Sequence, residues 1–190
     1  MLLLLSGLIF GTVSAWCQKP DTPARAVRAN FIDVDRRILA MAKDWPSDKY
    51  DYKLKLELRT FGAVLVHIAS GNVYAAKKGK GENVKWDELD PKNYPDKASV
   101  AALLEKPFAD SEAVLQSWPD EQFAKTVEPW LDVLEHSGEH YGLLVAYYLA
   151  KGAAPPESRP KKQTVLNGAQ ACENRTSTLY RHEFHRIRKI

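Results

Sequence analysis

Four segments of this 190-residue sequence repeat apolar side chains at intervals of three and four residues, and no other feature constrains the fold as strongly. This spacing places the apolar residues on one face of an α-helix. The predicted helices cover about residues 22–43, 56–77, 97–118 and 129–151. Because no segment carries a convincing strand pattern, we predict an all-α protein, a four-helix bundle of the up-and-down type.

Prolines and glycines mark the limits of these helices. Pro129 suits the first turn of the last helix, and Gly152 suits the residue after its end. Pro107 lies inside the third segment, where it should split or bend the helix. Residues 82–95 contain two prolines, and their apolar residues show little periodic spacing. We therefore expect a long surface connection between the second and third helices, which shapes a pocket mouth.

The composition is that of a single folded domain. The chain is long enough for one core and short for two. Its content of 45% apolar and 27% charged residues is typical of globular proteins, which argues against disorder and against a polytopic membrane protein.

The N-terminus predicts export. Residues 2–15 form an apolar run without charge, which has the length of a signal-peptide core and is short for a membrane-spanning helix. Val13, Ser14 and Ala15 supply the small residues before a cleavage site, so we predict a signal peptide at residues 1–15. The positive residue that usually precedes such a core is absent, and an uncleaved anchor or another start codon stays an alternative. We expect a periplasmic or extracellular protein without stable membrane insertion after cleavage.

The charge is divided unevenly along the chain. Residues 159–190 hold eight Lys and Arg against two Asp and Glu, and residues 1–158 hold 19 against 22, giving formal net charges of +6 and −3. We therefore predict a mildly acidic domain at residues 16–158, no nucleic-acid partner, and a basic, poorly ordered tail at residues 159–190. The tail histidines, His182 and His185, are assigned to no site. Cys17 and Cys172 do not form a disulfide framework.

Three histidines outside the tail carry the strongest chemical signal. His136 and His140 lie four residues apart in the last predicted helix, on one face and about one turn from each other. That face is apolar, so the pair should look inward. His67 stands among apolar residues in the second helix and is the candidate third ligand. A single such histidine would be read as a hydrogen-bonded core residue, but three together predict a site for one divalent metal ion, with zinc as the default and nickel as the main alternative.

Gly138 lies between these two histidines. A glycine inside a helix costs about 1 kcal/mol relative to alanine. Close approach of another helix or a local distortion at a functional site usually offsets this cost, so we predict a crowded site around Gly138.

Several stretches of the sequence resemble the DinB-like (YfiT-like) superfamily. They are Phe61 to Ala69, His136 to Leu149, Gly152 to Pro156 and the tract Trp45 to Tyr52. The resemblance covers roughly residues 24–158 and stops after Pro156, since residues 161–190 do not fit the family pattern. It implies a four-helix bundle with a divalent metal site of three histidines on the second and last helices, at His67, His136 and His140. Relatives include thiol-dependent transferases and isomerases, although most members have no assigned reaction.

These observations leave enzymatic and non-catalytic roles as alternatives. Three imidazoles leave a coordination position open, as in catalytic zinc sites. Together with the resemblance, which implies thiol-dependent transfer as one reaction class, this open position leads us to expect a metal-dependent hydrolase or thiol-dependent transferase with a small-molecule substrate. The alternative is a bundle that binds a metal or small ligand without catalysis. A homodimer is a candidate assembly.

Glu139 raises a third reading, because His136-x-x-Glu139-His140 is the inverted zinc-peptidase signature. A peptidase would need an acidic ligand downstream. Only Glu157, Glu173 and Glu183 follow, and all three lie outside the predicted bundle. We therefore expect Glu139 to orient a ligand imidazole or to lie on the helix surface.

Overall fold

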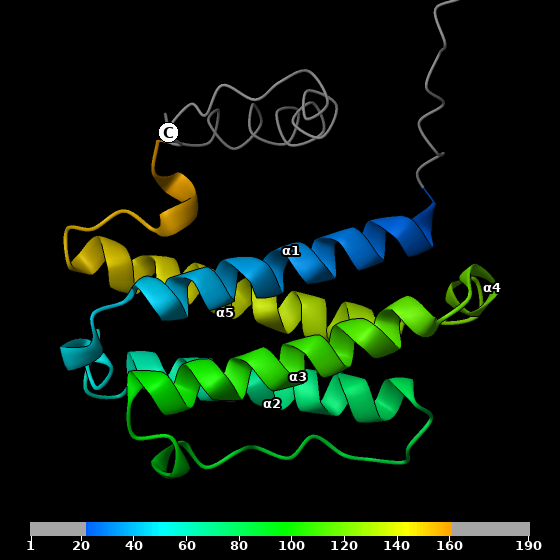
Figure 1. Ribbon diagram of the computed structural model, residues 1–190, viewed down its shortest axis with the longest axis horizontal. Coiled ribbons are helices and arrows are strands. Elements are labelled where there is room, and N and C mark those ends of the chain that lie inside the picture. The colour runs from blue at the N-terminus through cyan, green and yellow to red at the C-terminus, as the bar shows by residue number, and fades with distance from the viewer. Residues whose placement is uncertain (1–21, 161–190) are drawn as a thin grey trace, which may run out of the picture. The chain divides into compact units, whose positions relative to one another are not determined.

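The computed structural model describes residues 22–160, and within this range the chain is helical without any strand (Figure 1). Four long helices form the body: α1 (Pro23–Asp44), α2 (Phe61–Gly79), α3 (Lys97–Ser117) and α5 (Trp130–Ala150). A short helix, α4 (Asp120–Phe123), and the 3₁₀ turns η1 (Ser47–Lys49), η2 (Pro91–Asn93) and η3 (Pro156–Ser158) lie between or after them. The all-α prediction is confirmed for the described residues.

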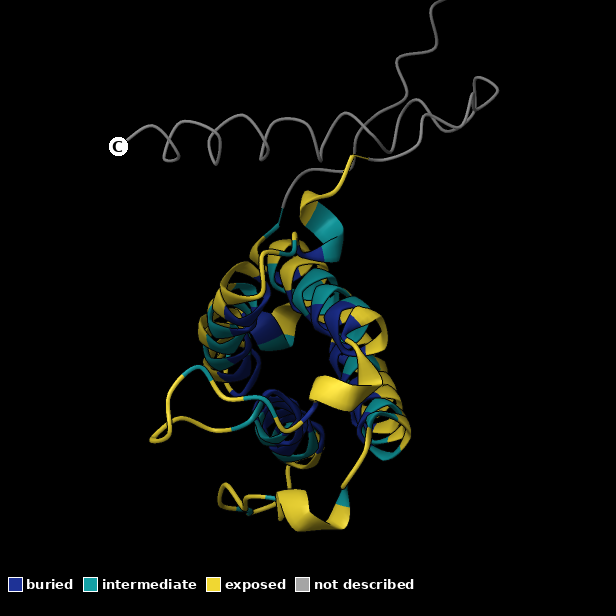
Figure 2. Cartoon of the chain, turned by 90° about the vertical axis from the view of Figure 1, so that its left-hand side faces the viewer, coloured by how far each residue is buried: buried dark blue, intermediate teal, exposed yellow. Residues whose placement is uncertain are grey.

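Each long helix packs mainly against two others. Helices α1 and α2 both contact α3 on one side and α5 on the other, and the pair α2 and α3 packs most extensively. Figure 2 shows the buried residues in dark blue on the sides of the helices that face one another. The apolar period in the sequence therefore predicts the buried faces correctly.

The connection between α2 and α3 determines the direction of the second half of the chain. It leaves the end of α2, runs back beside that helix and reaches the start of α3 at the opposite end (Figure 1). The long connection was predicted. Because it returns the chain along the full length of α2, α2 and α3 run in the same direction, which differs from the strict alternation of an up-and-down order.

Local side chains explain where the helices begin. The Oγ1 of Thr22 accepts a hydrogen bond from the backbone N–H of Arg25 at 3.2 Å, so α1 starts at Pro23. At the start of α3, Asp96 and Ser99 form a capping box. The predicted limits of the first and third helices are thus confirmed to within one or two residues.

The second helix starts later than the sequence predicts. Its N-cap is Thr60, whose Oγ1 accepts from the backbone N–H of Ala63 at 3.1 Å. Leu58 lies inside the predicted range of 56–77, but it precedes the helix and is 37% exposed. Turns occupy the segment before Thr60, so the apolar spacing there does not reflect a helix.

Prolines affect the helices less than expected. Helix α3 is continuous through Pro107, which is buried, so of the predicted split or bend the split does not occur. The burial of Leu104, Phe108 and Leu115 on the same helix offsets the missing backbone donor. Pro129 is the N-cap of α5 instead of lying in its first turn. Gly152 follows the helix with a φ of +69°, as predicted for a residue beyond the C-cap.

Two apolar clusters fill the interior. One contains Trp45, Phe61, Tyr147 and Tyr148, and the other contains Phe31, Trp118 and Trp130. None of the helices in the described range is both long and apolar enough to cross a membrane. The predicted signal peptide, Cys17, and the tail from residue 161 with Cys172, His182 and His185 lie outside the described residues.

Candidate metal centre

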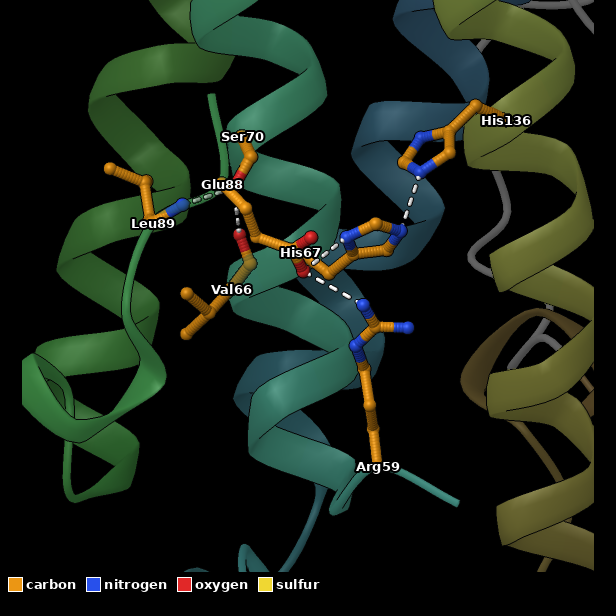
Figure 3. Close-up of polar contacts among 7 residues, drawn as sticks. All are labelled: Arg59, Val66, His67, Ser70, Glu88, Leu89 and His136. Carbon is orange, nitrogen blue, oxygen red and sulfur yellow. Dashed lines mark hydrogen bonds and ion pairs between the residues drawn. The ribbon is translucent and has the colours of Figure 1, made fainter. Parts of the chain in front are cut away.

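The three predicted histidines come together where α2 packs against α5. One potential ligand atom from each of His67, His136 and His140 lies within 4.8 Å of the others. The Nε2 atoms of His67 and His136 are 2.9 Å apart, and Figure 3 shows the two rings facing each other across the two helices. The prediction that these three residues form one cluster is confirmed.

Helix geometry explains the cluster. His136 and His140 project from the same face of α5, and their ring centroids are 4.5 Å apart. His67 lies on the side of α2 that faces α5, and its ring centroid is 4.7 Å from both of the others. All three histidines are half-buried. The site therefore lies at the edge of the helical interior, where solvent still has access.

A carboxylate from the α2–α3 connection completes one side of the site. Oε1 of Glu88 lies 2.7 Å from Nδ1 of His67, and the same oxygen accepts a hydrogen bond from Nη2 of Arg59 at 2.8 Å (Figure 3). Burial acts to raise the pKa of Glu88, but the His67 ring and the Arg59 guanidinium outweigh it and lower that pKa. Glu88 is therefore an ionised acceptor at neutral pH.

Trp86, from the same connection, covers His136. The two ring centroids are 4.7 Å apart, and Tyr74 packs against the tryptophan at 5.6 Å. Gly71 allows this contact, because a Cβ at that position would lie 2.7 Å from the Trp86 ring and 3.2 Å from Nδ1 of His136. The close approach predicted at Gly138 is wrong, since a Cβ there would meet nothing within 4 Å. The crowded glycine of this site is Gly71.

The electrostatics keep two of the imidazoles, His136 and His140, neutral. Burial, with the neighbouring His140 and His67 rings, lowers the pKa of His136 to about 4. Burial and the charges of His67 and Arg59 also lower the pKa of His140. Both rings therefore carry free lone pairs at pH 7, which is the state that binds a metal ion.

The donor set fits a divalent ion. Neutral imidazoles suit zinc and nickel, and a carboxylate on the far nitrogen of a ligand histidine is the usual second contact in zinc sites. In addition, Nδ1 of His136 is buried and has no hydrogen-bond partner in the described part of the chain. Leaving such a group unpaired costs about 1–3 kcal/mol. That cost argues against a purely structural role for His136.

Glu139 does not take part in the cluster. It is exposed on α5, and no hydrogen bond joins it to the three histidines within residues 22–160. Of the two roles expected for Glu139, the position on the helix surface is the one that the structure shows, and the carboxylate that contacts a cluster histidine is Glu88. Glu157, a possible peptidase ligand, forms an ion pair with Arg36 at 2.7 Å.

Sequence reasoning missed Arg59, Trp86 and Glu88. The signal was weak because the connection has no period and holds neighbouring acidic residues, Asp87 and Asp90, that look equivalent in sequence. Spacing alone does not single out Glu88. Its role depends on how the connection runs along α2.

The chain matches a known protein family. The family model described as the DinB superfamily matches residues 30–149, a range that contains all three histidines. No curated protein matches the chain with significance.

Proposed function

The chain belongs to the DinB superfamily, and on that premise we propose that it is a four-helix bundle holding one divalent metal ion through His67, His136 and His140. The observation that carries the proposal is the convergence of three ligand atoms within 4.8 Å, from two helices that are far apart in sequence. Zinc is the proposed metal, and nickel is the alternative.

We propose that the centre acts on a small molecule. A bound ion would supply Lewis acidity and a coordination position open to water or to a substrate donor. The chain's own residues hold the ligands in place: Glu88 accepts from the His67 ring, and Trp86 packs over His136. Hydrolysis and thiol-dependent transfer are the reaction classes that fit such a site.

A peptidase role has less support. The signature around Glu139 requires a glutamate beside the metal and a further acidic ligand, but Glu139 is exposed and Glu157 is paired with Arg36. The competing role is therefore a bundle that binds a metal or small ligand without catalysis.

Metal analysis of the purified protein tests the proposal. We expect about one zinc or nickel ion per chain in the wild type and loss of that ion in His67→Ala, His136→Ala and His140→Ala. His185→Ala is the matched control, since this histidine lies in the tail, and it should keep the metal. Full retention of metal in the three cluster variants would refute the proposed site.

An activity screen then separates the two roles. Loaded and chelator-treated protein would be assayed for ester and amide hydrolysis and for transfer to small thiols. Turnover that depends on the metal supports an enzyme. Bound metal without turnover in these assays supports the binding bundle.

Export is a separate proposal, based on the apolar run at residues 2–15. Cell fractionation and N-terminal sequencing test it. We expect a mature protein that starts at Trp16, and an intact N-terminus in the cytoplasm would contradict this.

A further inference from the structure

We propose that Glu88 is a positioning residue of the metal centre, which fixes the tautomer and the direction of the His67 ring. This inference rests on the proposed function, since it concerns the same site. It adds a role for the α2–α3 connection, a segment that contributes none of the three histidines.

The hydrogen bond to His67 decides the tautomer. A neutral imidazole has one nitrogen that donates and one that accepts, whereas an ionised carboxylate only accepts. Nδ1 of His67 lies 2.7 Å from Oε1 of Glu88, so Nδ1 must carry the proton. In the neutral form of the ring, which is the form that binds a metal ion, the lone pair then lies on Nε2, the atom that is 2.9 Å from Nε2 of His136. The carboxylate therefore turns the ligand atom of His67 toward the other two histidines.

Arg59 helps to keep Glu88 in the required state. Its guanidinium donates to the same oxygen at 2.8 Å and favours the ionised carboxylate. Figure 3 shows the carboxylate lying between the His67 ring and the Arg59 guanidinium. Arg59 directly precedes Thr60, the N-cap of α2. The two side chains that contact the Glu88 carboxylate, His67 and Arg59, therefore both belong to α2 or to the residue just before its cap.

Two anchors hold the connection on either side of Glu88. The backbone N–H of Leu89 donates to Oγ of Ser70 at 3.0 Å, and Ser70 is fully buried in α2. On the other side, Trp86 packs where Gly71 leaves room for it. Glu88 therefore lies between two anchored neighbours, and the α2 residues that anchor them, Ser70 and Gly71, are about one turn from His67. This placement distinguishes Glu88 from an ordinary surface acid.

The competing explanation is a surface ion pair with Arg59 and no influence on the metal. Glu88 has a side chain that is 44% exposed, and exposed ion pairs contribute little to stability. This explanation expects no change in metal affinity when Glu88 is replaced. The two explanations therefore differ in a quantity that can be measured directly.

The experiment is a competition titration of the full chain with zinc and a chromogenic chelator. Loss of such an outer contact typically weakens metal binding by about 10-fold to 100-fold. We expect Glu88→Gln to bind zinc about tenfold more weakly than the wild type, and Glu88→Ala to be weaker still. Asp87→Asn is the matched control, because Asp87 is exposed on the same connection, and it should keep the wild-type Kd.

Nuclear magnetic resonance of the zinc-loaded protein provides a readout that a merely structural role would not change. In the wild type, the Nδ1 proton of His67 should appear far downfield, as expected for a proton shared with a carboxylate. In Glu88→Gln this resonance should move upfield or exchange too fast to observe, with the metal-free melting temperature unchanged.

The outcomes separate the two proposals. Wild-type protein that binds no zinc overturns the proposed function and this inference together. Wild-type protein that binds zinc with the same Kd as Glu88→Gln and Glu88→Ala overturns the inference alone. Weaker binding in both variants, with Asp87→Asn unchanged and the His67 resonance altered, supports it.

Discussion

Two polar clusters lie in the interior of this protein, and they use their hydrogen-bonding groups in opposite ways. In the histidine cluster, three half-buried imidazoles converge between α2 and α5. In the second, which we call the core cluster, Asp35, Asn72 and Ser111 are almost fully buried between α1, α2 and α3. The Nδ2 of Asn72 donates to Oδ1 of Asp35 at 3.3 Å, and Oγ of Ser111 donates to Oδ1 of Asn72 at 2.6 Å. In the core cluster, hydrogen bonds join the three side chains and leave Oδ2 of Asp35 as its one buried side-chain atom without a partner in the described residues. The histidine cluster instead presents lone pairs to a shared point.

Both clusters depend on α2. His67 and Asn72 are five residues apart, which turns their side chains about 140° from each other around the helix axis. One helix therefore presents His67 to α5 and Asn72 to α1 and α3. A buried polar residue is therefore a candidate ligand when its partners leave a lone pair unused at an accessible edge.

The largest expected effect comes from breaking the histidine cluster. Zinc at 100 times its Kd should raise the free energy of unfolding of the wild type by about 2.7 kcal/mol. His136→Ala should show none of this gain, because it removes one ligand, whereas Asp35→Asn in the core cluster should keep all of it. Chemical denaturation with and without zinc measures both. A full gain in His136→Ala would mean that zinc binds elsewhere.

The next effect comes from breaking the core cluster. Asn72→Ala leaves Asp35 Oδ1 and the Ser111 hydroxyl without this shared partner. An unpaired buried polar group costs roughly 1–3 kcal/mol, so we expect the free energy of unfolding to fall by about 2 kcal/mol. The Kd for zinc should stay at the wild-type value. A change in zinc affinity as large as that in Glu88→Gln would show that the two clusters are coupled.

The two glycines of the histidine region should respond oppositely to alanine. At Gly71 a Cβ would lie 2.7 Å from Trp86, so Gly71→Ala should displace that ring and cost about 1–2 kcal/mol. At Gly138 there is open space, and Gly138→Ala should stabilise α5 by up to about 1 kcal/mol. Thermal unfolding measures both variants. Equal stability changes would contradict the close packing of the connection on α2.

The smallest expected effect is a pH dependence of opposite sign in the metal-free protein. Burial raises the pKa of Asp35 well above its ordinary value of 3.8, so its contribution to stability is lost as the pH rises from about 4 through the raised pKa. For His136 the pKa falls from 6.5 to about 4, so its contribution is present above pH 6.5 and is lost as the pH falls toward 4.

Variants separate these two contributions. As the pH rises, the free energy of unfolding of Asp35→Asn should increase relative to that of the wild type. The expected difference is about 1 kcal/mol, the usual size of the effect of a single substitution. The stability of His136→Ala should fall less than that of the wild type between pH 6.5 and pH 4. Urea unfolding across this range provides the measurement. The same pH slope in wild type and both variants would contradict the assignment.

The sequence by itself determined the features that depend on a few neighbouring residues. Thr22 begins a helix because its side chain caps the residues that follow it, and Gly152 ends one because it adopts a positive φ. His136 and His140 share a face because the helical period places residues four apart together. Even His67 could be selected, since a histidine among apolar residues is conspicuous on a helix that must pack.

Only the tertiary structure decided the features that depend on the path of a connection or on which helix faces which. Glu88 contacts His67 because the chain runs back along α2, and Gly71 is crowded because Trp86 and His136 pack against it, whereas Gly138 is not. Asp35 finds Asn72 across the interior, 37 residues away. These contacts join segments with no common period, so local spacing carries no information about them, and the packing of whole helices must be known first.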